Sequence, residues 1–419
     1  MLNLYALIVL AALLLDQALT LAAGLLDLRA LRRRPPAGLE ELYDRERYEK
    51  AQAYKQTLTR FGLFRSGVQL LLLLGFWFAG GFPRVQELAR QFGGEGPVVT
   101  GLLFFALLFL LRSLVGLPFQ LYATFVIEER FGFNRTRPVT FITDRLKGLL
   151  LALLLGAPLG AGVIAFFAYA GPLAWLGVWG AVTLFNLFLQ FIGPAWIMPL
   201  FNKFTSLEEG ELKERLLAYA RSVGFPVNKI FVIDGSRRSA KANAFFSGFG
   251  RHRRIALFDT LVADLSPPQL VAVLAHEIAH YLKKHILKST LLGILHMGVV
   301  CFLLSLFLRV EGLHRAFGME EVTIHGGLVF FGLLYAPLEL LLSPLLNLLS
   351  RHHEFQADRH AAANLPDPRE LAGALKRLAV KNLANLTPHP FSVFLYHSHP
   401  PLAARLEAID RHVQKNQDT

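Results

Sequence analysis

Cysteine is almost absent from this chain, in which Cys301 is the only one among 419 residues. An intramolecular disulfide needs two cysteines and a cysteine-rich zinc site needs several, so the sequence excludes both. Because Cys301 lies in an apolar run, we interpret it as a small buried apolar side chain. Neither a disulfide nor a cysteine cluster therefore holds this fold together.

Charge is also scarce, since only 18% of the residues are charged and 53% are hydrophobic. This composition is typical of a polytopic membrane protein rather than of a soluble domain. The formal net charge of +12 would suggest nucleic acid in a soluble protein. Here the basic residues cluster in loops between apolar segments, and no basic stripe is interleaved with stacking aromatics. We therefore expect no nucleic-acid partner and interpret the charge as a topology signal.

Seven apolar segments are each near the roughly 20 residues that cross a bilayer. They cover residues 4–26, 63–81, 98–125, 149–169, 173–200, 286–308 and 326–349. The first is too long for a cleaved signal peptide and lacks an early basic region and a cleavage site. The sequence thus predicts a mainly α, polytopic membrane protein with about seven transmembrane helices and a small α+β region.

Arginine and lysine alternate between the loops that join these segments. The loops after the first, third and fifth segments are rich in both, whereas the loops after the second, fourth and sixth hold two at most. This alternation places the N-terminus outside and the C-terminus in the cytoplasm. Asp16, Arg112 and Glu339 fall within the segments, where charge is costly. We expect them to face a protein interior or a water-filled space, unless each lies near an interface or pairs with a neighbour.

The stretch from His276 to His280 reads His-Glu-Ile-Ala-His, which puts two imidazoles one helical turn apart on the same face. Two such imidazoles can hold one Zn²⁺, and Glu277 between them can reach a metal-activated water as general base. The alternative is two partly exposed histidines on an ordinary helix. Ser266 and Gln269 have the spacing of a capping box, so the motif lies well inside a real helix. We expect that helix to run straight into the apolar segment 286–308.

The region between the fifth segment and the motif is the main soluble insertion. An amphipathic helix is predicted from Thr205 and Ser206 through about Val223. Residues 230–233 have the pattern of a short strand, and residues 243–249 and 255–260 that of two strands around a turn.

A catalytic zinc needs a third protein ligand and one open position. Glu354 and Asp358, which follow the last apolar segment, are spaced i, i+4 and can face one point. Glu354 can bind the metal while Asp358 accepts a proton from the far nitrogen of a ligand histidine. His352 and His353 are competing ligands, and a solvated acidic face is the alternative to a site. We expect one Zn²⁺ per chain.

The chain resembles the type I CAAX prenyl protease family, which are integral-membrane zinc metallopeptidases. The similarity runs in consistent order from about Glu128 to Arg405. Its motifs are the stretches 199–205, 243–248, 255–261, 276–280, 350–358 and 398–405. The resemblance implies seven long helices around a large water-filled intramembrane chamber, with the zinc site near its cytoplasmic end.

The resemblance also carries residue roles. His276, His280 and Glu354 match the family's three zinc ligands. Glu277 matches its general base, and Asp358 matches the carboxylate that lies behind a ligand. Asn243 matches a residue that hydrogen-bonds the substrate backbone. His399 and Arg405 match groups that bind the substrate or stabilise the developing oxyanion during catalysis. An extended peptide could add to the edge of the strand 255–260 with Asn243 holding its backbone.

The sequence therefore predicts a zinc-dependent integral-membrane endopeptidase. The family name implies a prenylated protein substrate that loses its C-terminal tripeptide. The expected partners are a peptide or membrane-associated protein, lipidated or not, and membrane lipid. One alternative is an HtpX-like quality-control protease, against which the span count and the 398–405 motif weigh. A transporter with a structural metal is a further alternative, but the inverted repeats and paired broken helices that would support it are not seen.

The expected organisation has four parts. Residues 1–200 form transmembrane helices one to five with basic cytoplasmic loops. Residues 201–285 form a cytoplasmic α+β region that ends in the motif helix, and 286–350 form helices six and seven. Residues 351–419 hold the third ligand and a cytoplasmic C-terminal region. The expected location is a bacterial inner membrane, or the endoplasmic reticulum if the source is eukaryotic, with the active site towards the cytoplasm.

Overall fold

The computed structural model describes residues 2–417, except 32, 37, 41, 226, 228 and 248–253. Within this part of the chain, seven helices are long and apolar enough to cross a membrane. They are α1 (Leu4–Ala30), α2 (Arg45–Phe78), Pro97–Glu128 with α4 and η1, Pro138–Tyr169 with α5 and α6, Gly171–Phe201 with α7 and α8, α12 (His285–Phe307) and α14 (Ile324–Asn364). Each overlaps one predicted segment, so the expected seven spans are confirmed.

Several of these spans are composite helices. The bounds of their parts are α4 (Pro97–Tyr122), η1 (Ala123–Glu128), α5 (Pro138–Leu151), η2 (Ala152–Gly156), α6 (Ala157–Tyr169), η3 (Gly171–Leu173), α7 (Ala174–Ile192), η4 (Gly193–Ile197) and α8 (Met198–Phe201). Segments η1, η2 and η4 are π-helical. Such wide turns relax the hydrogen-bond ladder inside a long helix without ending it.

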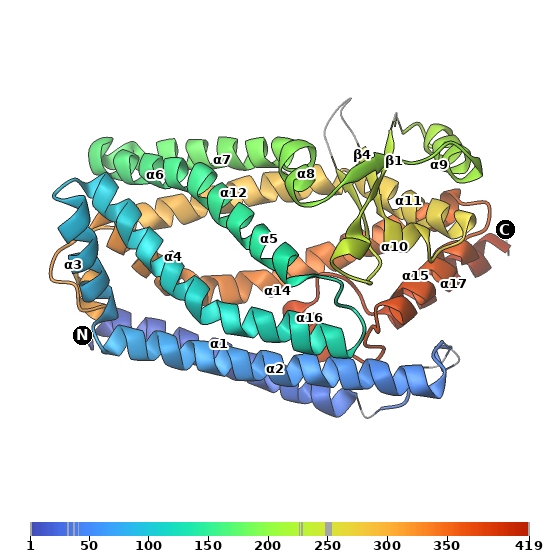
Figure 1. The fold of residues 1–419 in the computed structure, drawn as a ribbon, viewed down its shortest axis with the longest axis horizontal. Coiled ribbons are helices and arrows are strands. Elements are labelled where there is room, and N and C mark those ends of the chain that lie inside the picture. The colour runs from blue at the N-terminus through green and yellow to red at the C-terminus, as the bar shows by residue number, and fades with distance from the viewer. Residues whose placement is uncertain are drawn as a thin grey trace.

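The two ends of the molecule are built from different helices and strands (Figure 1). The N-terminus lies at one end with α3 (Gly81–Gly93), and α13 (Glu311–Ala316) packs there against α1 and α14. An aromatic stack holds this end together, because Phe317 lies between Trp77 and Phe330 with ring centroids 4.6 and 4.3 Å away. The sheet and the C-terminus lie at the opposite end.

A four-stranded sheet, counted over the described residues, has the order β1-β2-β4-β3. Its strands are β1 (Phe204–Ser206), β2 (Ile230–Ile233), β3 (Ala244–Ser247) and β4 (Arg254–Phe258). β2 and β4 are parallel, and the two outer pairs are antiparallel. The strand expected at 230–233 is confirmed, β3 begins one residue later than expected, and β4 covers 254–258 rather than 255–260. Residues 248–253, which hold the end of one expected strand and the whole expected turn, lie outside the described residues.

The helix expected to begin at Thr205 is wrong at its start. Thr205 lies in β1 opposite Val232, and helix α9 begins only at Glu211 (Glu211–Ser222). A Thr-Ser pair before acidic residues is a local helix-cap signal. Here the backbone of these residues pairs with β2 instead of capping a helix. Thr260, expected in a strand, belongs instead to α10 (Asp259–Val262).

One hydrophobic core joins the sheet to the helices around it. Side chains of β2, β4, α9, α11 (Pro267–Leu282), α14, α15 (Arg369–Lys381) and α17 (Leu402–Gln417) contribute to it. Two short helices, η5 (Gly235–Arg237) and α16 (Pro390–Tyr396), lie in the connections. Helix α11 contributes Leu270, Leu274 and Ile278, all 1% exposed or less. The motif helix is therefore held on a rigid support.

The motif helix does not run straight into the sixth span, contrary to expectation. Helix α11 ends at Leu282, and α12 begins at His285 after Lys284 adopts a left-handed conformation with φ 57°. A lysine carries no sequence signal for this conformation, which glycine or asparagine usually supplies. The chain therefore turns immediately after the motif.

A cavity of about 750 Å³ lies between α7, α12 and α14. Its lining runs from His280 and Glu354 along α12 as far as Met297, and it includes His296, whose Nε2 lies 3.8 Å from the Glu339 carboxylate. Of the three ionisable residues expected inside the spans, Glu339 thus lies beside a residue of this cavity. The other two, Asp16 and Arg112, are exposed on their helices.

Candidate metal centre

Helix α11 presents His276 and His280 on one face. The predicted capping box is present, since Ser266 Oγ accepts from the Gln269 backbone N–H and the Gln269 side chain accepts from the Ser266 backbone. The helix is thereby fixed from its first turn. The spacing of four residues then brings the two Nε2 atoms within 3.2 Å of each other.

Helix α14 brings Glu354 to the same point. Its Oε2 lies 3.5 Å from His276 Nε2, and its Oε1 lies 3.3 Å from His280 Nε2. One ligand atom from each of the three residues lies within 4.8 Å of the other two. His276 and Glu354 are buried, and His280 is half-buried. The three predicted ligands are thus brought together in a largely water-excluded position.

Asp358 lies behind His276, one turn along α14 from Glu354. The His276 Nδ1 lies 2.9 Å from Asp358 Oδ1, which leaves Nε2 directed at the other two residues. Burial lowers the pKa of His276, but hydrogen bonds to Asp358 and Glu354 outweigh it and raise the pKa to about 9. The predicted partnership of Asp358 with a histidine of the motif is present in the geometry.

Arg405 of α17 is directed at the same carboxylate. Its Nη2 and Nε donate to the two oxygens of Asp358 at 2.6 and 2.7 Å, and its Nη1 lies 3.5 Å from Glu354 Oε2. Burial lowers the pKa of Arg405, but these carboxylates more than compensate and raise it. Arg405 therefore stays charged beside the cluster, with two of its three nitrogens engaged by Asp358.

His280 has its own partner, which the sequence reasoning missed. Its Nδ1 lies 3.1 Å from Nδ1 of His285, and His285 Nε2 lies 2.9 Å from Gln356 Oε1. His353 stacks on His285 with ring centroids 4.1 Å apart, and His352 bonds Gln356. The two histidines considered as competing ligands are thus engaged elsewhere. A signal was present in the five-residue spacing of His285 from His280, but a straight helix would separate them by about 140°.

Glu277 lies between the two motif histidines on α11. Burial raises the pKa of Glu277 above its ordinary value, although the neighbouring His276 and His280 partly oppose this. A carboxylate with a raised pKa is a stronger base once it is ionised. Its position and its electrostatics both suit the predicted proton acceptor.

His399 approaches the cluster from the segment between α16 and α17. Its Nε2 lies 3.5 Å from Glu354 Oε1, and its ring is 66% exposed. Arg351 of α14 anchors this segment by donating to the carbonyl oxygens of Val393 and His397 at 2.9 and 2.5 Å. An exposed ring beside a buried carboxylate is accessible to a bound substrate.

Asn243 precedes β3 and is exposed. The residue before it, Ala242, is clamped because Asn382 accepts from its N–H and donates to its carbonyl at 3.0 and 3.1 Å. The expected peptide-binding edge at 255–260 is wrong, since β4 pairs with β2 on one side and β3 on the other. A strand with two partners has no ladder groups left for a peptide. The edge beside Asn243 belongs to β3.

The donor set fits a zinc ion. Two histidines and a glutamate form a common catalytic zinc triad, and two nitrogens bound tetrahedrally to one ion at 2.0–2.1 Å lie about 3.3 Å apart. The observed separation of the two Nε2 atoms is 3.2 Å. Glu354 Oε2 is buried, and His276 Nε2 and Arg405 Nη1 each lie 3.5 Å from it, which is too long for a strong hydrogen bond and leaves the oxygen able to bind a closer metal ion.

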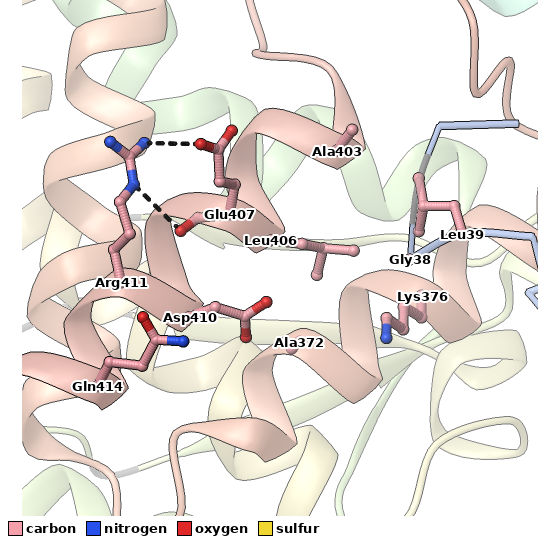
Figure 2. A pocket seen from close by; sticks show the side chains of 10 residues that line it. All are labelled: Gly38, Leu39, Ala372, Lys376, Ala403, Leu406, Glu407, Asp410, Arg411 and Gln414. Carbon is pink, nitrogen blue, oxygen red and sulfur yellow. Dashed lines mark hydrogen bonds and ion pairs between the residues drawn. The ribbon is translucent and has the colours of Figure 1, made fainter. Parts of the chain in front are cut away.

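A second, smaller pocket lies elsewhere. It has a volume of about 290 Å³ and lies between residues 38–39, α15 and α17 (Figure 2). Arg411 bonds Glu407 at its rim, while Lys376 and Asp410 add charges of both signs. Its lining contains none of the candidate site residues. Two of the candidate metal ligands, His280 and Glu354, instead line the cavity between α7, α12 and α14.

Comparisons with known proteins agree with this geometry. Residues 26–203 match the family model described as CAAX prenyl protease N-terminal, five membrane helices, and residues 206–413 match peptidase family M48. The chain is 36% identical over 382 residues to CAAX prenyl protease 1 homolog of Oryza sativa subsp. japonica, with 90% of each covered. It is 35% identical over 405 residues to CAAX prenyl protease 1 of Saccharomyces cerevisiae, covering 90% of this chain and 88% of the relative.

A solved structure extends the likeness to the whole fold. The crystal structure of S. mikatae Ste24p superposes with a TM-score of 0.90 at 34% sequence identity, covering 98% of this chain and 99% of the other. At this identity and coverage the likeness includes the arrangement of the membrane helices as well as the sheet.

Proposed function

Because the chain belongs to peptidase family M48 and is a multi-pass membrane metallopeptidase, we propose that it removes the C-terminal tripeptide of prenylated proteins. The observation that carries this proposal is the convergence of His276, His280 and Glu354 beside a cavity bounded by membrane helices. The match to CAAX prenyl proteases over about 90% of the chain favours this function over the HtpX-like alternative.

We assign the metal as one Zn²⁺ held by His276, His280 and Glu354. When bound, the ion supplies Lewis-acid activation of a water and of the scissile carbonyl. Asp358 holds His276 with its Nε2 towards the site and supplies negative charge behind it. The donor types and the buried Glu354 oxygen, whose neighbouring nitrogens lie 3.5 Å away, support this assignment.

Glu277 is the proposed general base. Its ionised carboxylate takes a proton from the attacking water and later delivers a proton to the leaving amine. Burial raises the pKa of Glu277, which strengthens it as a base and favours the return of the proton. Its place between the two motif histidines supports this role.

His399 and Arg405 are the proposed catalytic donors to the oxyanion that develops on the scissile carbonyl. His399 Nε2 lies 3.5 Å from Glu354 Oε1, and Arg405 Nη1 lies 3.5 Å from the other oxygen, Oε2. Asn243 is the proposed substrate-binding residue, and it would hold the peptide backbone along the edge of β3. The fixed position of Ala242 beside it supports this placement.

The cavity suits a lipidated peptide. Its lining mixes apolar residues such as Leu187, Ile294 and Met297 with polar residues such as Asn186 and Gln190. An apolar prenyl chain and a polar peptide backbone need both kinds of surface. We propose that the active site faces the cytoplasm, and that the membrane is a bacterial inner membrane or, in a eukaryote, the endoplasmic reticulum.

The test is hydrolysis by the full chain in detergent or vesicles. A quenched peptide with a prenylated C-terminal cysteine motif should be cleaved, cleavage should stop with a chelator, and zinc should restore it. The same peptide without the prenyl group serves as the matched control. Equal kcat/KM values for the two peptides would leave a metallopeptidase but overturn the prenylated-substrate proposal.

A further inference from the structure

The nitrogen of His280 that points away from Glu354 begins a chain of hydrogen-bonded side chains. His280 Nδ1 contacts His285 Nδ1 at 3.1 Å, and His285 Nε2 contacts Gln356 Oε1 at 2.9 Å. Gln356 Nε2 then contacts His352 Nε2 at 2.9 Å. The chain runs from α11 through the first residue of α12 to α14 and ends at an exposed histidine.

The proton positions along this chain follow from one requirement. If His280 Nε2 offers its lone pair to a metal, the proton of the neutral ring is on Nδ1 and is donated to His285. His285 then accepts at Nδ1 and donates its own proton from Nε2 to the Gln356 carbonyl oxygen. The Gln356 amide in turn donates to His352. Every contact has one donor and one acceptor, so a single arrangement satisfies the whole chain.

The backbone break after the motif makes the first contact possible. Residues five apart on a continuous helix lie about 140° apart around its axis, so His285 would face away from His280. The left-handed φ of 57° at Lys284 turns the chain and returns His285 to His280. A left-handed non-glycine residue costs about 1–2 kcal/mol. Such strain at a site is typical of a geometry that function requires.

The ring plane of His285 is fixed as well. His353 stacks against it with an interplanar angle of 11° and a centroid distance of 4.1 Å. His285 is 3% exposed. The imidazole therefore cannot rotate away from His280 without losing both the stack and the bond to Gln356.

We propose that His285 and Gln356 are positioning residues, which hold His280 in the tautomer and orientation that direct Nε2 at the metal. They do for His280 what Asp358 does for His276, but through a neutral chain rather than a carboxylate. This inference rests on the proposed metal site. Partners of this kind typically change metal affinity by about 10–100-fold.

The experiment measures zinc affinity of the full-length protein in detergent, by competition with a chromophoric chelator after metal removal. His285→Phe keeps an aromatic ring to stack on His353 but removes the acceptor. His285→Asn keeps an acceptor near the position of Nδ1. We expect the first to weaken zinc binding by about 10–100-fold and the second to recover much of that loss.

Gln356 provides an independent pair. Gln356→Leu removes the acceptor for His285 and should weaken zinc binding, whereas Gln356→Glu keeps an acceptor and should retain it. If a His285 variant does not fold, this pair decides the question. His360→Phe is the control, because it also removes an imidazole from α14. The Nε2 of His360 has no hydrogen-bond partner in the described part of the chain.

The outcomes separate the two proposals. Wild-type protein that binds no zinc would overturn the metal site itself. Wild-type protein that binds zinc no better than His285→Phe and Gln356→Leu would overturn only the positioning role. Equal losses in His285→Phe and His285→Asn, at an unchanged melting temperature of the metal-free protein, would also overturn it, because the acceptor would then be irrelevant. The visible absorption of the cobalt-substituted proteins reports the ligand geometry independently of activity.

Discussion

Arg405 and Asp358 form a two-point ion pair, with nitrogen–oxygen distances of 2.6 and 2.7 Å. Asp358 is 1% exposed, and it also holds His276 through Nδ1. The guanidinium therefore supports a residue behind the metal centre while its third nitrogen faces Glu354. Arg405 could stabilise the oxyanion, hold Asp358 in place, or do both, and these roles predict different effects when Arg405 is substituted.

Arg405→Ala leaves the buried Asp358 carboxylate without its guanidinium. Breaking a buried pair in this way typically costs about 3–5 kcal/mol, so we expect a clear drop in melting temperature. Arg405→Lys keeps the charge but not the two-point geometry, and should recover only part of the stability. If Nη1 also stabilises the oxyanion, the kcat/KM of both variants should fall while zinc stays stoichiometric. The fall should correspond to a loss of about 2–4 kcal/mol of transition-state stabilisation. Unchanged kcat/KM in Arg405→Lys would assign Arg405 to support alone.

Glu277→Gln should retain zinc but lose hydrolysis. The amide keeps the size of the side chain but cannot take the proton of the attacking water. General-base catalysis is typically worth about 10²–10⁴-fold, which sets the expected fall in kcat. Zinc content and peptide kinetics on the same preparation check this, with Glu214→Gln on the exposed face of α9 as the matched control. Wild-type turnover by Glu277→Gln would refute the mechanism.

The parts of the site that the sequence predicted depend on local spacing. The capping box and the four-residue spacing of His276 and His280 are properties of one helix, and both are present. The i, i+4 spacing of Glu354 and Asp358 likewise put both carboxylates beside His276. Spacing alone left His352 and His353 as competing ligands and a solvated acidic face as an alternative. The family resemblance favoured Glu354 as the ligand.

The errors all involve partners distant in sequence or a backbone conformation without a sequence signal. Thr205 has a helix-cap pattern, but it forms a strand because it pairs with Val232 of β2. β4 is central because a parallel pairing with β2 places it there, and no local pattern encodes strand order. The turn at Lys284 arises at a lysine, so His285 could not be connected with His280 from the sequence.

Glu354 is predicted to be the third ligand in preference to its histidine neighbours. Loss of a residue that only orients a ligand typically weakens metal binding by about 10–100-fold, and Glu354→Ala should weaken zinc binding by more than that. His352→Ala and His353→Ala should have much smaller effects, because both rings are engaged away from the cluster. Chelator competition on the three variants measures this. Loss of zinc from His353→Ala equal to that from Glu354→Ala would contradict the assignment.

Zinc binding should release a proton at neutral pH. Despite burial, hydrogen bonds to Asp358 and Glu354 raise the pKa of His276 to about 9 in the metal-free protein, so its ring is protonated at pH 7. The metal needs the lone pair of Nε2, so affinity should fall by about tenfold per pH unit below pH 9 through this group and level off above it. Calorimetry in buffers of different ionisation enthalpy counts the protons. Asp358→Asn should lower the pKa and the count, and an unchanged count would refute the role given to Asp358.

Orientation is the remaining prediction, with the N-terminus outside and the metal centre towards the cytoplasm. The turn at Gly171 and the C-terminal region are separated by three spans, Gly171–Phe201, α12 and α14, so they should lie on opposite sides. Arginine and lysine are concentrated in the loops on the side of the C-terminus, which favours the cytoplasm for that side. Gly171→Cys and Asn416→Cys, each in a Cys301→Ser background, should react with an impermeant maleimide from opposite faces of sealed vesicles. Cys301 is 3% exposed, so its removal eliminates only a buried thiol. Labelling of both positions from one side would contradict the seven-span topology, and a reversed pattern would retain the spans but place the metal centre outside.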